Sequence, residues 1–592
     1  MTTKSLALVL AALAAGCVKT TDVSAPFNTD WLDDRGSSIA EVERALRGTP
    51  APPNTNVVVG VTDKALVGMP LDGGRSWTQP ATPDTLPAVA GNLVVYSAGG
   101  KITALDATTG APRWSVDADG YVLRGAGDDG EHTVLSLGRT GGRRESAMLS
   151  VSRSGTVRAR VATESELGRP AARGGIGFVP WAGQYVSAID LESGQEVGRL
   201  LSRELTSHAL SVGSELFFGE KGISHFDADI RYASTKQNAR SALPERVLPG
   251  KPRWLQPGGE LPLIDTGARA RIRIYATPQW DAGETRFASG RFASTYFRTV
   301  MVFDALDAKL SWVRAVPNDV IGGGAAQSGF VFCLADGRAL RFGAAGGDAG
   351  ALNLGSPLRG CVVDADTLVL PAGDPIGPLE KQLAAALKEL DPEMAAAQSF
   401  LVTELGRIDR PEVAKTLIDL TTRPRVPPVV RARARELLSQ RRTGAEFMLE
   451  ALEKQYDFLS GTLPPPVGPL AVALAAMKET RAAPLLARHL NDPATESADV
   501  EKAARALADL ATANELPNLK TFFALYRATA DEPALVNAVS SVALALLRVG
   551  GEEGRTIVER AARDPLTRPD VTRTLTPLVA APASPDAALS GR

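Results

Sequence analysis

Residues 98–118 read AGGKITALDATTGAPRWSVDA, and this stretch decides the fold of the first two thirds of the chain. Residues 102–105 are short and apolar, and residues 113–116 alternate between exposed and apolar types. Between them, Asp106 can accept hydrogen bonds from its own backbone, and Gly110 can adopt a positive φ. The stretch therefore predicts a β-hairpin closed by a short loop.

The tryptophan that follows this turn predicts more hairpins. An indole has roughly 150–250 Å² to bury, worth about 4–6 kcal/mol, and a lone hairpin cannot cover Trp114. The turn recurs along the chain, and most steps are close to the period of roughly 40 residues of a four-stranded propeller blade. Positions equivalent to Asp106 fall at residues 72, 152, 190, 227, 304 and 343.

These repeats predict a β-propeller over residues 56–372. The spacing favours seven blades, with eight as the alternative, because the step from Asp227 to Asp304 is about twice the period. Residues 360–370 read as strand and are expected to complete the blade that begins near Asn56.

The segment ITALDATTGAPRW resembles the repeat shared by quinoprotein dehydrogenase propellers and by the non-enzymatic outer-membrane assembly lipoprotein of the β-barrel machinery. In that repeat, an Asp, Thr-Gly and Trp signature docks adjacent blades. The resemblance covers roughly residues 57–372 and implies a blade-docking role for Trp77, Trp114 and Trp312.

The N-terminus has the layout of a secretory signal. Lys4 precedes an apolar run that is too short to span a bilayer, and small residues follow it. The sequence LAAGC ending at Cys17 resembles a bacterial lipobox, which implies that residues 1–16 are removed and that Cys17 carries lipid. Secretion with ordinary cleavage nearby is the alternative. Residues 17–55 are expected to form a tether that contains a short helix.

The amino-acid composition changes near the linker at residues 373–378, where strand-like sequence gives way to helical sequence rich in Ala, Leu, Arg and Glu. Residues 483–511 resemble a HEAT or armadillo-type helix pair. Similar pairs recur about every 35 residues, which predicts an α-solenoid of HEAT-like pairs over residues 379–580, with a flexible tail at residues 581–592. The pairs begin near Pro411, Ala445, Leu516 and Glu553.

One segment of the propeller is rich in Arg and aromatic residues, the types that binding hot spots use. We expect it to form a partner surface on an enlarged strand connection. In the alternative, the aromatic rings pack under their own loop and the arginines are solvated. The candidate residues are Arg271, Arg273, Trp280, Arg286, Phe287, Arg291, Phe292 and Tyr296.

The sequence predicts no catalytic, cofactor-binding or metal-binding residues. The chain's 4 histidines lack metal-ligand spacing, and no adjacent cysteine pair is present to carry over from quinone enzymes. Cys333 and Cys361 lie in strand-like text, so buried free thiols are expected, with a disulfide as the alternative. A formal net charge of -2 gives no reason to expect a nucleic-acid partner.

These observations lead to the hypothesis of a non-enzymatic scaffold, anchored by lipid in the cell envelope, that binds other proteins through its propeller and solenoid surfaces. We expect it at the outer membrane facing the periplasm, with envelope proteins as partners, in outer-membrane protein assembly or envelope organisation. Two alternatives are a quinone-dependent dehydrogenase-like enzyme and a surface sensor or polysaccharide-binding lipoprotein.

Overall fold

The structure is a computed structural model. The chain divides into two compact units, residues 1–253 with 262–377 and residues 254–261 with 378–592. The signal segment, Cys17 and the tail at residues 581–592 lie outside the part that the structure describes. The described residues are 26–28, 42, 44–139, 145–201, 206–212, 215–219, 273–275, 291–304, 309–388, 392–454 and 463–580.

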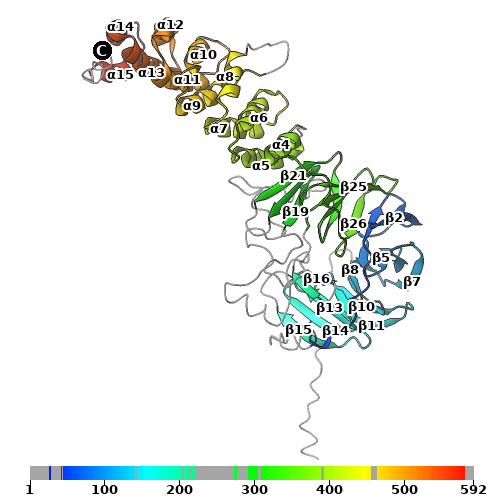
Figure 1. The fold of residues 1–592 in the computed structure, drawn as a ribbon. Coiled ribbons are helices and arrows are strands. Elements are labelled where there is room, and N and C mark those ends of the chain that lie inside the picture. The colour runs from blue at the N-terminus through cyan, green and yellow to red at the C-terminus, as the bar shows by residue number, and fades with distance from the viewer. Residues whose placement is uncertain are drawn as a thin grey trace, which may run out of the picture. The chain divides into compact units, whose positions relative to one another are not determined.

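The first unit is built from antiparallel sheets (Figure 1). Its described residues form six four-stranded sheets and one two-stranded sheet. Five of the four-stranded sheets use consecutive strands: β4 (Ala88–Ala90) to β7 (Pro112–Asp117), β8 (Tyr121–Asp128) to β11 (Val157–Thr163), β12 (Ala171–Arg173) to β15 (Glu196–Leu201), β18 (Arg273–Tyr275) to β21 (Leu310–Ala315), and β22 (Val320–Ala326) to β25 (Asp348–Asn353).

The inner strands of these sheets have the bounds β5 (Leu93–Ala98), β6 (Lys101–Asp106), β9 (His132–Arg139), β10 (Ser146–Ser152), β13 (Ile176–Trp181), β14 (Tyr185–Asp190), β19 (Arg291–Tyr296), β20 (Thr299–Asp304), β23 (Gly329–Leu334) and β24 (Arg338–Gly343). The two-stranded sheet pairs β16 (His208–Val212) with β17 (Glu215–Gly219). Residues 220–272, which would decide the number of blades, lie outside the described residues.

The hairpin predicted from residues 98–118 is confirmed as β6 and β7, with Ala104 opposite Trp114. The Asp106 carboxylate holds the turn, because its Oδ1 accepts hydrogen bonds from the backbone N–H groups of Thr108 and Thr109 at 3.1 and 2.9 Å. Gly110 has a φ of 71°, which favours glycine at this point of the turn.

The remaining four-stranded sheet joins the two ends of the propeller region. Its order is β26 (Gly360–Asp364), β1 (Val57–Val61), β2 (Ala65–Pro70) and β3 (Trp77–Pro80). Val57 pairs with Asp364 and Val61 with Gly360, so residues 360–364 complete the blade that begins after Asn56, as expected. The first strands of successive described sheets are neighbours, β26 beside β4 and β4 beside β8, as in a propeller.

Cys333 on β23 and Cys361 on β26 form a disulfide, with their Cα atoms 6.4 Å apart. The expectation of two free thiols is therefore wrong. The bond forms because β26 lies against the β22 to β25 sheet, which brings together two strands that are 28 residues apart in sequence. It ties the closing strand to its neighbour.

The second unit is helical, and its described residues form twelve α-helices and two short 3₁₀ helices. They are α4 (Leu379–Ala386), η7 (Pro392–Met394), α5 (Ala395–Gly406), α6 (Pro411–Thr422), α7 (Pro428–Ser439), α8 (Ala445–Glu453), α9 (Val467–Ala476), α10 (Ala482–His489), α11 (Ser497–Leu510), η9 (Ala513–Glu515), α12 (Leu516–Thr529), α13 (Pro533–Val549), α14 (Gly551–Arg563) and α15 (Pro569–Ala580).

These helices pack in two rows (Figure 1). One row runs from α5 through α7, α9, α11 and α13 to α15, and the other from α4 through α6, α8 and α10 to α12. The predicted starts at Pro411, Ala445 and Leu516 are the first residues of α6, α8 and α12. On α11, Val500 and Leu507 lie on the buried face that the sequence period predicts. No described helix is both long and apolar enough to cross a bilayer.

Candidate functional site

Two of the indoles singled out in the sequence bond to the neighbouring sheet. Trp77 Nε1 on β3 donates to the Ala107 carbonyl at 2.9 Å, and Trp312 Nε1 on β21 donates to the Ala344 carbonyl at 2.8 Å. Both acceptors lie in the turn between the third and fourth strands of the next sheet. These contacts make each turn part of the support for the sheet before it.

A glycine in each of these turns makes room for the ring. A Cβ atom added to Gly110 would lie 2.7 Å from the Trp77 indole, and one added to Gly346 would lie 2.8 Å from Trp312. Trp114 approaches Gly155 in the same way, since a Cβ there would lie 2.8 Å from Trp114 Cβ. Its Nε1, however, is buried and has no hydrogen-bond partner. All three tryptophans thus pack against a turn glycine of the next sheet, but only Trp77 and Trp312 also donate a hydrogen bond to that turn.

The expected partner surface falls largely outside the description. Arg271, Trp280, Arg286 and Phe287 are outside the described residues, and the side chains of Arg273 and Phe292 are not described. The two remaining members lie inside the fold. Arg291 Nη1 donates to the Ala344 carbonyl at 2.6 Å, and Tyr296 is 1% exposed, with its ring 5.0 Å from that of Phe297. These two side chains contribute to packing, since β19 is a regular strand of its sheet.

The first strands of five sheets converge on a small cavity of about 40 Å³ lined by three carboxylates, those of Asp128, Asp364 and Asp366. Asp364 ends β26, and Asp366 follows it in the next turn. Arg169 also lines this cavity, and its Nη2 donates to the Val89 carbonyl at 3.0 Å. Asp364 Oδ1 is buried and accepts no hydrogen bond. We call this cavity the hub.

Burial raises the pKa of all three hub carboxyl groups, while hydrogen bonds from Thr133 and Gly130 oppose the rise at Asp128. The charge of Asp366 raises the pKa of Asp364 further, while Arg169 opposes the rise at both. A single guanidinium beside two buried carboxylates favours a state in which the pair shares a proton. The hub is therefore a point of charge compensation at the closing strand.

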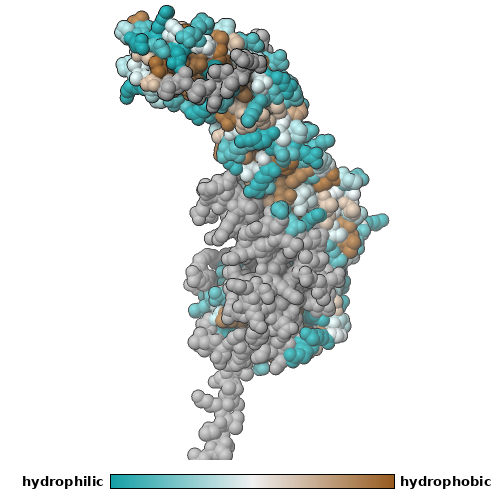
Figure 2. All heavy atoms as spheres, turned by 60° about the vertical axis from the view of Figure 1, so that its left-hand side comes forward, coloured by the Kyte–Doolittle hydropathy of each residue, from teal (hydrophilic) through white to brown (hydrophobic). Residues whose placement is uncertain are grey.

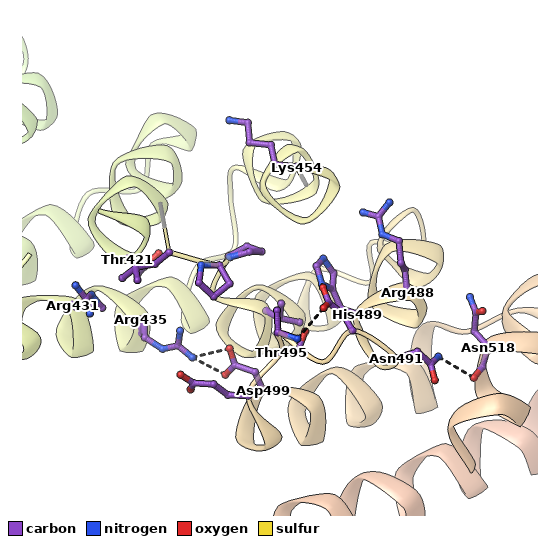
Figure 3. Close-up of a pocket in the computed structure, with 17 residues that line it drawn as sticks. Thr421, Arg431, Arg435, Lys454, Arg488, His489, Asn491, Thr495, Asp499 and Asn518 are labelled. Atoms are coloured by element: carbon purple, nitrogen blue, oxygen red, sulfur yellow. Dashed lines mark hydrogen bonds and ion pairs between the residues drawn. The ribbon is translucent and has the colours of Figure 1, made fainter. Parts of the chain in front are cut away.

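The helical unit contains a larger cavity of about 730 Å³, drawn in Figure 3. We call it the helical cavity. Part of its lining is apolar, from Leu463 to Val467, and polar and charged side chains from α7, α10 and α11 surround that part. The lining residues are Thr421, Arg431, Arg435, Lys454, Leu463, Pro464, Pro465, Val467, Arg488, His489, Asn491, Asp492, Ala494, Thr495, Glu496, Asp499 and Asn518.

One wall of the helical cavity is a bidentate ion pair between the helices (Figure 3). Arg435 Nη2 on α7 donates to Asp499 Oδ1 and Oδ2 on α11, at 2.6 and 2.8 Å. Asp499 is 4% exposed, so its carboxylate depends on this guanidinium for compensation. The pair fixes the width of the cavity.

Other basic side chains of the cavity complete helix ends. Arg431 Nη2 donates to the carbonyls of residues 423, 424 and 426 just beyond α6, at 3.0 to 3.2 Å. Arg488 Nη2 donates to the Leu452 carbonyl near the end of α8 at 2.9 Å, and His489 Nε2 lies 2.9 Å from the same oxygen. Cations at the carbonyl end of a helix are stabilising. These residues therefore serve the fold first.

Three lining residues are not held in this way. The Lys454 side chain is 72% exposed, and its ion pair among the described residues is with Glu450, at 3.1 Å. In Figure 3, Thr495 lies between Arg435 and His489, and Asn518, a residue of α12, lies beyond Asn491. A concave surface with an apolar part and a few polar groups is the ordinary form of a binding site. The helical cavity can therefore receive a short segment of another molecule.

The exposed apolar side chains of the helical unit are scattered. Val429 on α7, Val472 on α9 and Leu544 on α13 are each more than one third exposed. Figure 2 shows brown apolar residues interspersed with teal polar ones over the helical region. Single exposed apolar residues are normal on soluble surfaces. They therefore identify no separate binding patch.

Within the described parts of the chain, no group of three His, Cys, Asp or Glu side chains is placed to hold a metal ion. Of the four histidines, His225 lies outside the described residues. His132 Nε2 lies 3.3 Å from Glu192, His208 Nδ1 lies 2.8 Å from Ser207, and His489 belongs to the helical cavity. Each of these three has a local partner.

The fold and these contacts define a PQQ-like repeat propeller followed in the same chain by a helical region. Residues 55–221 match the family model described as outer membrane protein assembly factor BamB. No curated protein matches the chain in sequence.

Several solved structures resemble the chain. BamB from Moraxella catarrhalis is 14% identical, with 52% of this chain and 85% of that chain covered and a TM-score of 0.27. Apo AztD from Citrobacter koseri is 10% identical, with 52% and 83% covered and a TM-score of 0.29. Quinohemoprotein alcohol dehydrogenase ADHIIG from Pseudomonas putida HK5 is 11% identical, with 58% and 71% covered and a TM-score of 0.29. At these identities and TM-scores the likenesses assign neither activity nor partner.

Sequence reasoning missed the hub pair and the helical cavity. Asp364 and Asp366 follow a strand as an ordinary Asp-Ala-Asp turn would, and nothing in the sequence brings Arg169 to them. The basic run around Arg435, with Glu436 inside it, is typical of a solvated helix face with local ion pairs. Arg433 does pair with Glu436, at 2.6 Å, but Arg435 bonds across to Asp499. The sequence offers one signal for this ion pair, which is that Asp499 falls on the buried face of α11.

Proposed function

We propose that the protein is a non-enzymatic, lipid-anchored scaffold of the cell envelope that binds other envelope proteins. Outer-membrane protein assembly or envelope organisation is the process that we propose for it. The observation that carries the proposal is the helical cavity, which offers an apolar surface and exposed polar groups in a chain whose propeller region has a BamB-like family match. Seven blades and HEAT-like helix pairs are the finer architecture that goes with it.

The Cys333–Cys361 disulfide supports the envelope location. Structural disulfides persist in oxidising compartments and are rare in the reducing cytosol. This argument is independent of the N-terminal signal and of the lipobox ending at Cys17. The two lines together favour an exported chain held at a membrane.

Division of labour between the units follows from their contacts. In the propeller, Trp77 and Trp312 each tie their own sheet to a turn of the next sheet, which makes these parts of the propeller rigid. In the helical cavity, the Arg435 to Asp499 pair holds two helices at a fixed separation. A partner segment would place apolar side chains on Pro464 and its neighbours and polar groups near Lys454. Such a site selects a partner by shape and leaves it chemically unchanged.

Affinity purification from detergent-solubilised envelopes tests this proposal. We expect the wild-type chain to retain one or more envelope proteins in stoichiometric amount. Thr495→Trp fills the helical cavity without removing a described side-chain hydrogen bond, so it should lose at least one of them. Lys388→Glu, at an exposed position beyond α4, is the matched control and should keep them all. The proposal is wrong if nothing is retained, or if Thr495→Trp retains the same proteins as the wild type.

Deleting residues 278–297 would be a poor test of the expected partner surface. That segment contains all of β19, which pairs with β18 and β20 in the middle of a sheet. Loss of a partner would then follow from loss of the sheet. The helical cavity variants avoid this ambiguity because they leave the propeller intact.

A further inference from the structure

Three residues of the N-terminal segment are built into the propeller. Phe27 is 3% exposed and belongs to an apolar cluster that includes Val134, Met148 and Trp181. Its ring lies edge-on to the Trp181 indole, with centroids 6.0 Å apart. Trp181 ends β13, so the segment packs against the β12 to β15 sheet. We call residues 26–28 the plug.

The plug also completes a buried ion pair. Arg199 on β15 is 1% exposed, and its Nε and Nη2 donate to the two oxygens of Glu196 at 2.6 and 2.7 Å. Its Nη1 donates to the Asn28 carbonyl at 2.6 Å. A buried guanidinium needs an acceptor for each donor direction, because an unmatched one is costly. The plug therefore supplies a required acceptor, and the contact is specific rather than incidental.

A second contact attaches the segment to the same sheet. Arg173 on β12 is 3% exposed, and it donates to the Leu46 carbonyl and to Thr49 Oγ1, both at 3.2 Å. The Leu46 side chain packs in a cluster with Phe178 and Val186 of that sheet. The chain is thus fixed at residues 26–28 and again at residues 46–49. Residues 17–55, expected to be a tether that contains a short helix, thus have two attachment points to this sheet.

We propose that the plug holds the β12 to β15 edge of the propeller next to a lipid surface. This inference rests on the proposed lipid anchor at Cys17. Phe27 is ten residues after Cys17 (27 − 17), so the connection spans at most about 33–36 Å when fully extended. Without the plug, the first attachment would be Leu46, at 29 residues (46 − 17) and at most about 100 Å. The plug shortens the chain between Cys17 and the first attachment point roughly threefold, and it selects which sheet is nearest the membrane.

Energy transfer to vesicles tests this orientation. The lipidated full-length chain would be reconstituted in phosphatidylethanolamine and phosphatidylglycerol vesicles that carry an acceptor dye on their headgroups. A donor dye would be placed on Gln184→Cys, in the exposed turn beside Trp181, or on Ser76→Cys, in the exposed turn between β2 and β3. The three native cysteines do not compete, because Cys17 carries the lipid and Cys333 is bonded to Cys361.

We expect higher transfer from position 184 than from position 76. Inserting about 20 Gly and Ser residues after Val23 lengthens the chain between Cys17 and Phe27 and keeps the plug. Energy transfer from position 184 should therefore fall, while the thermal unfolding temperature stays unchanged. Phe27→Ala should lower the difference between the two positions. Equal transfer from both positions, or no effect of the insertion, would overturn the inference. Failure of the anchor is distinguishable, since the wild type would then stay in solution like Cys17→Ser, and that result would overturn both proposals.

Discussion

The indole contacts between sheets lead to a prediction with an internal control. Trp→Phe keeps an aromatic ring at each docking position but removes the Nε1–H donor. At Trp77 and Trp312 the lost donor leaves the Ala107 and Ala344 carbonyls with one hydrogen bond fewer. At Trp114 the Nε1 is buried and has no partner, so nothing comparable is lost there. The three substitutions share the loss of ring volume and differ in the hydrogen bond.

The magnitude follows from that difference. A hydrogen bond of this kind contributes about 0.5–1.5 kcal/mol net to stability. Trp77→Phe and Trp312→Phe should therefore lower the free energy of unfolding by about 1 kcal/mol more than Trp114→Phe does. Truncation to alanine adds a cavity. Since Trp312 is 1% exposed, Trp312→Ala should cost about 3–5 kcal/mol.

Denaturant unfolding of the full-length chain, followed by far-ultraviolet circular dichroism, measures these differences. Tryptophan fluorescence is unsuitable because the substitutions change the probe. The reasoning fails if Trp114→Phe costs as much as Trp77→Phe and Trp312→Phe. It also fails if all three phenylalanine variants are as stable as the wild type, since docking would then not depend on the indoles.

Four further predictions concern the disulfide, the hub, the helical cavity and the absence of quinone chemistry. Replacing both Cys333 and Cys361 by serine should lower the free energy of unfolding by about 3–4 kcal/mol, the loop-closure value for a separation of 28 residues, and unchanged stability with and without reductant would contradict this. Burial and the Asp366 charge raise the pKa of Asp364 to about 8 from 3.8. The contribution of Asp364 to the free energy of unfolding is therefore fully present below about pH 4 and is lost as the pH rises through 8. Asp364→Asn should make the unfolding temperature fall less steeply over this pH range, and parallel curves for the variant and the wild type would contradict the assignment. Arg435→Ala leaves the Asp499 carboxylate uncompensated and should cost roughly 2–4 kcal/mol, with partial recovery in the Arg435→Ala, Asp499→Asn double variant by calorimetry; no recovery would contradict the pairing. Adding quinone cofactor and Ca²⁺ should give neither quinone absorbance on the purified chain nor dye-linked alcohol oxidation, and either signal would contradict the non-enzymatic proposal.

Local patterns predict the elements of this protein well. The turn at Asp106 to Gly110 has one conformation that its residues favour, so β6 and β7 could be assigned from sequence. The helix starts at Pro411 and Ala445 follow from proline at the first helical position and from the apolar period. These features depend on residues that are close in sequence. Local chemistry is therefore sufficient for them.

Features that depend on distant residues could not be predicted. The Cys333 to Cys361 bond requires knowing that β26 lies against the preceding sheet. The plug requires knowing that Phe27 meets Trp181, more than a hundred residues later. For the candidate site, Lys454 and Thr495 are separated in sequence by two helices, α9 and α10, and belong to one cavity only after the two rows pack. In each case the missing information is the three-dimensional arrangement of elements that the sequence identifies separately.

Closure of the first sheet by β26 has a consequence for biogenesis. Strand β1 is made early, yet its inner partner β26 follows about three hundred residues later, at residues 360–364. Until β26 emerges, β1 presents an unsatisfied edge that can pair with another nascent chain. A chaperone that shields such edges would therefore raise the yield of folded protein, and truncation before residue 360 would produce chains that aggregate.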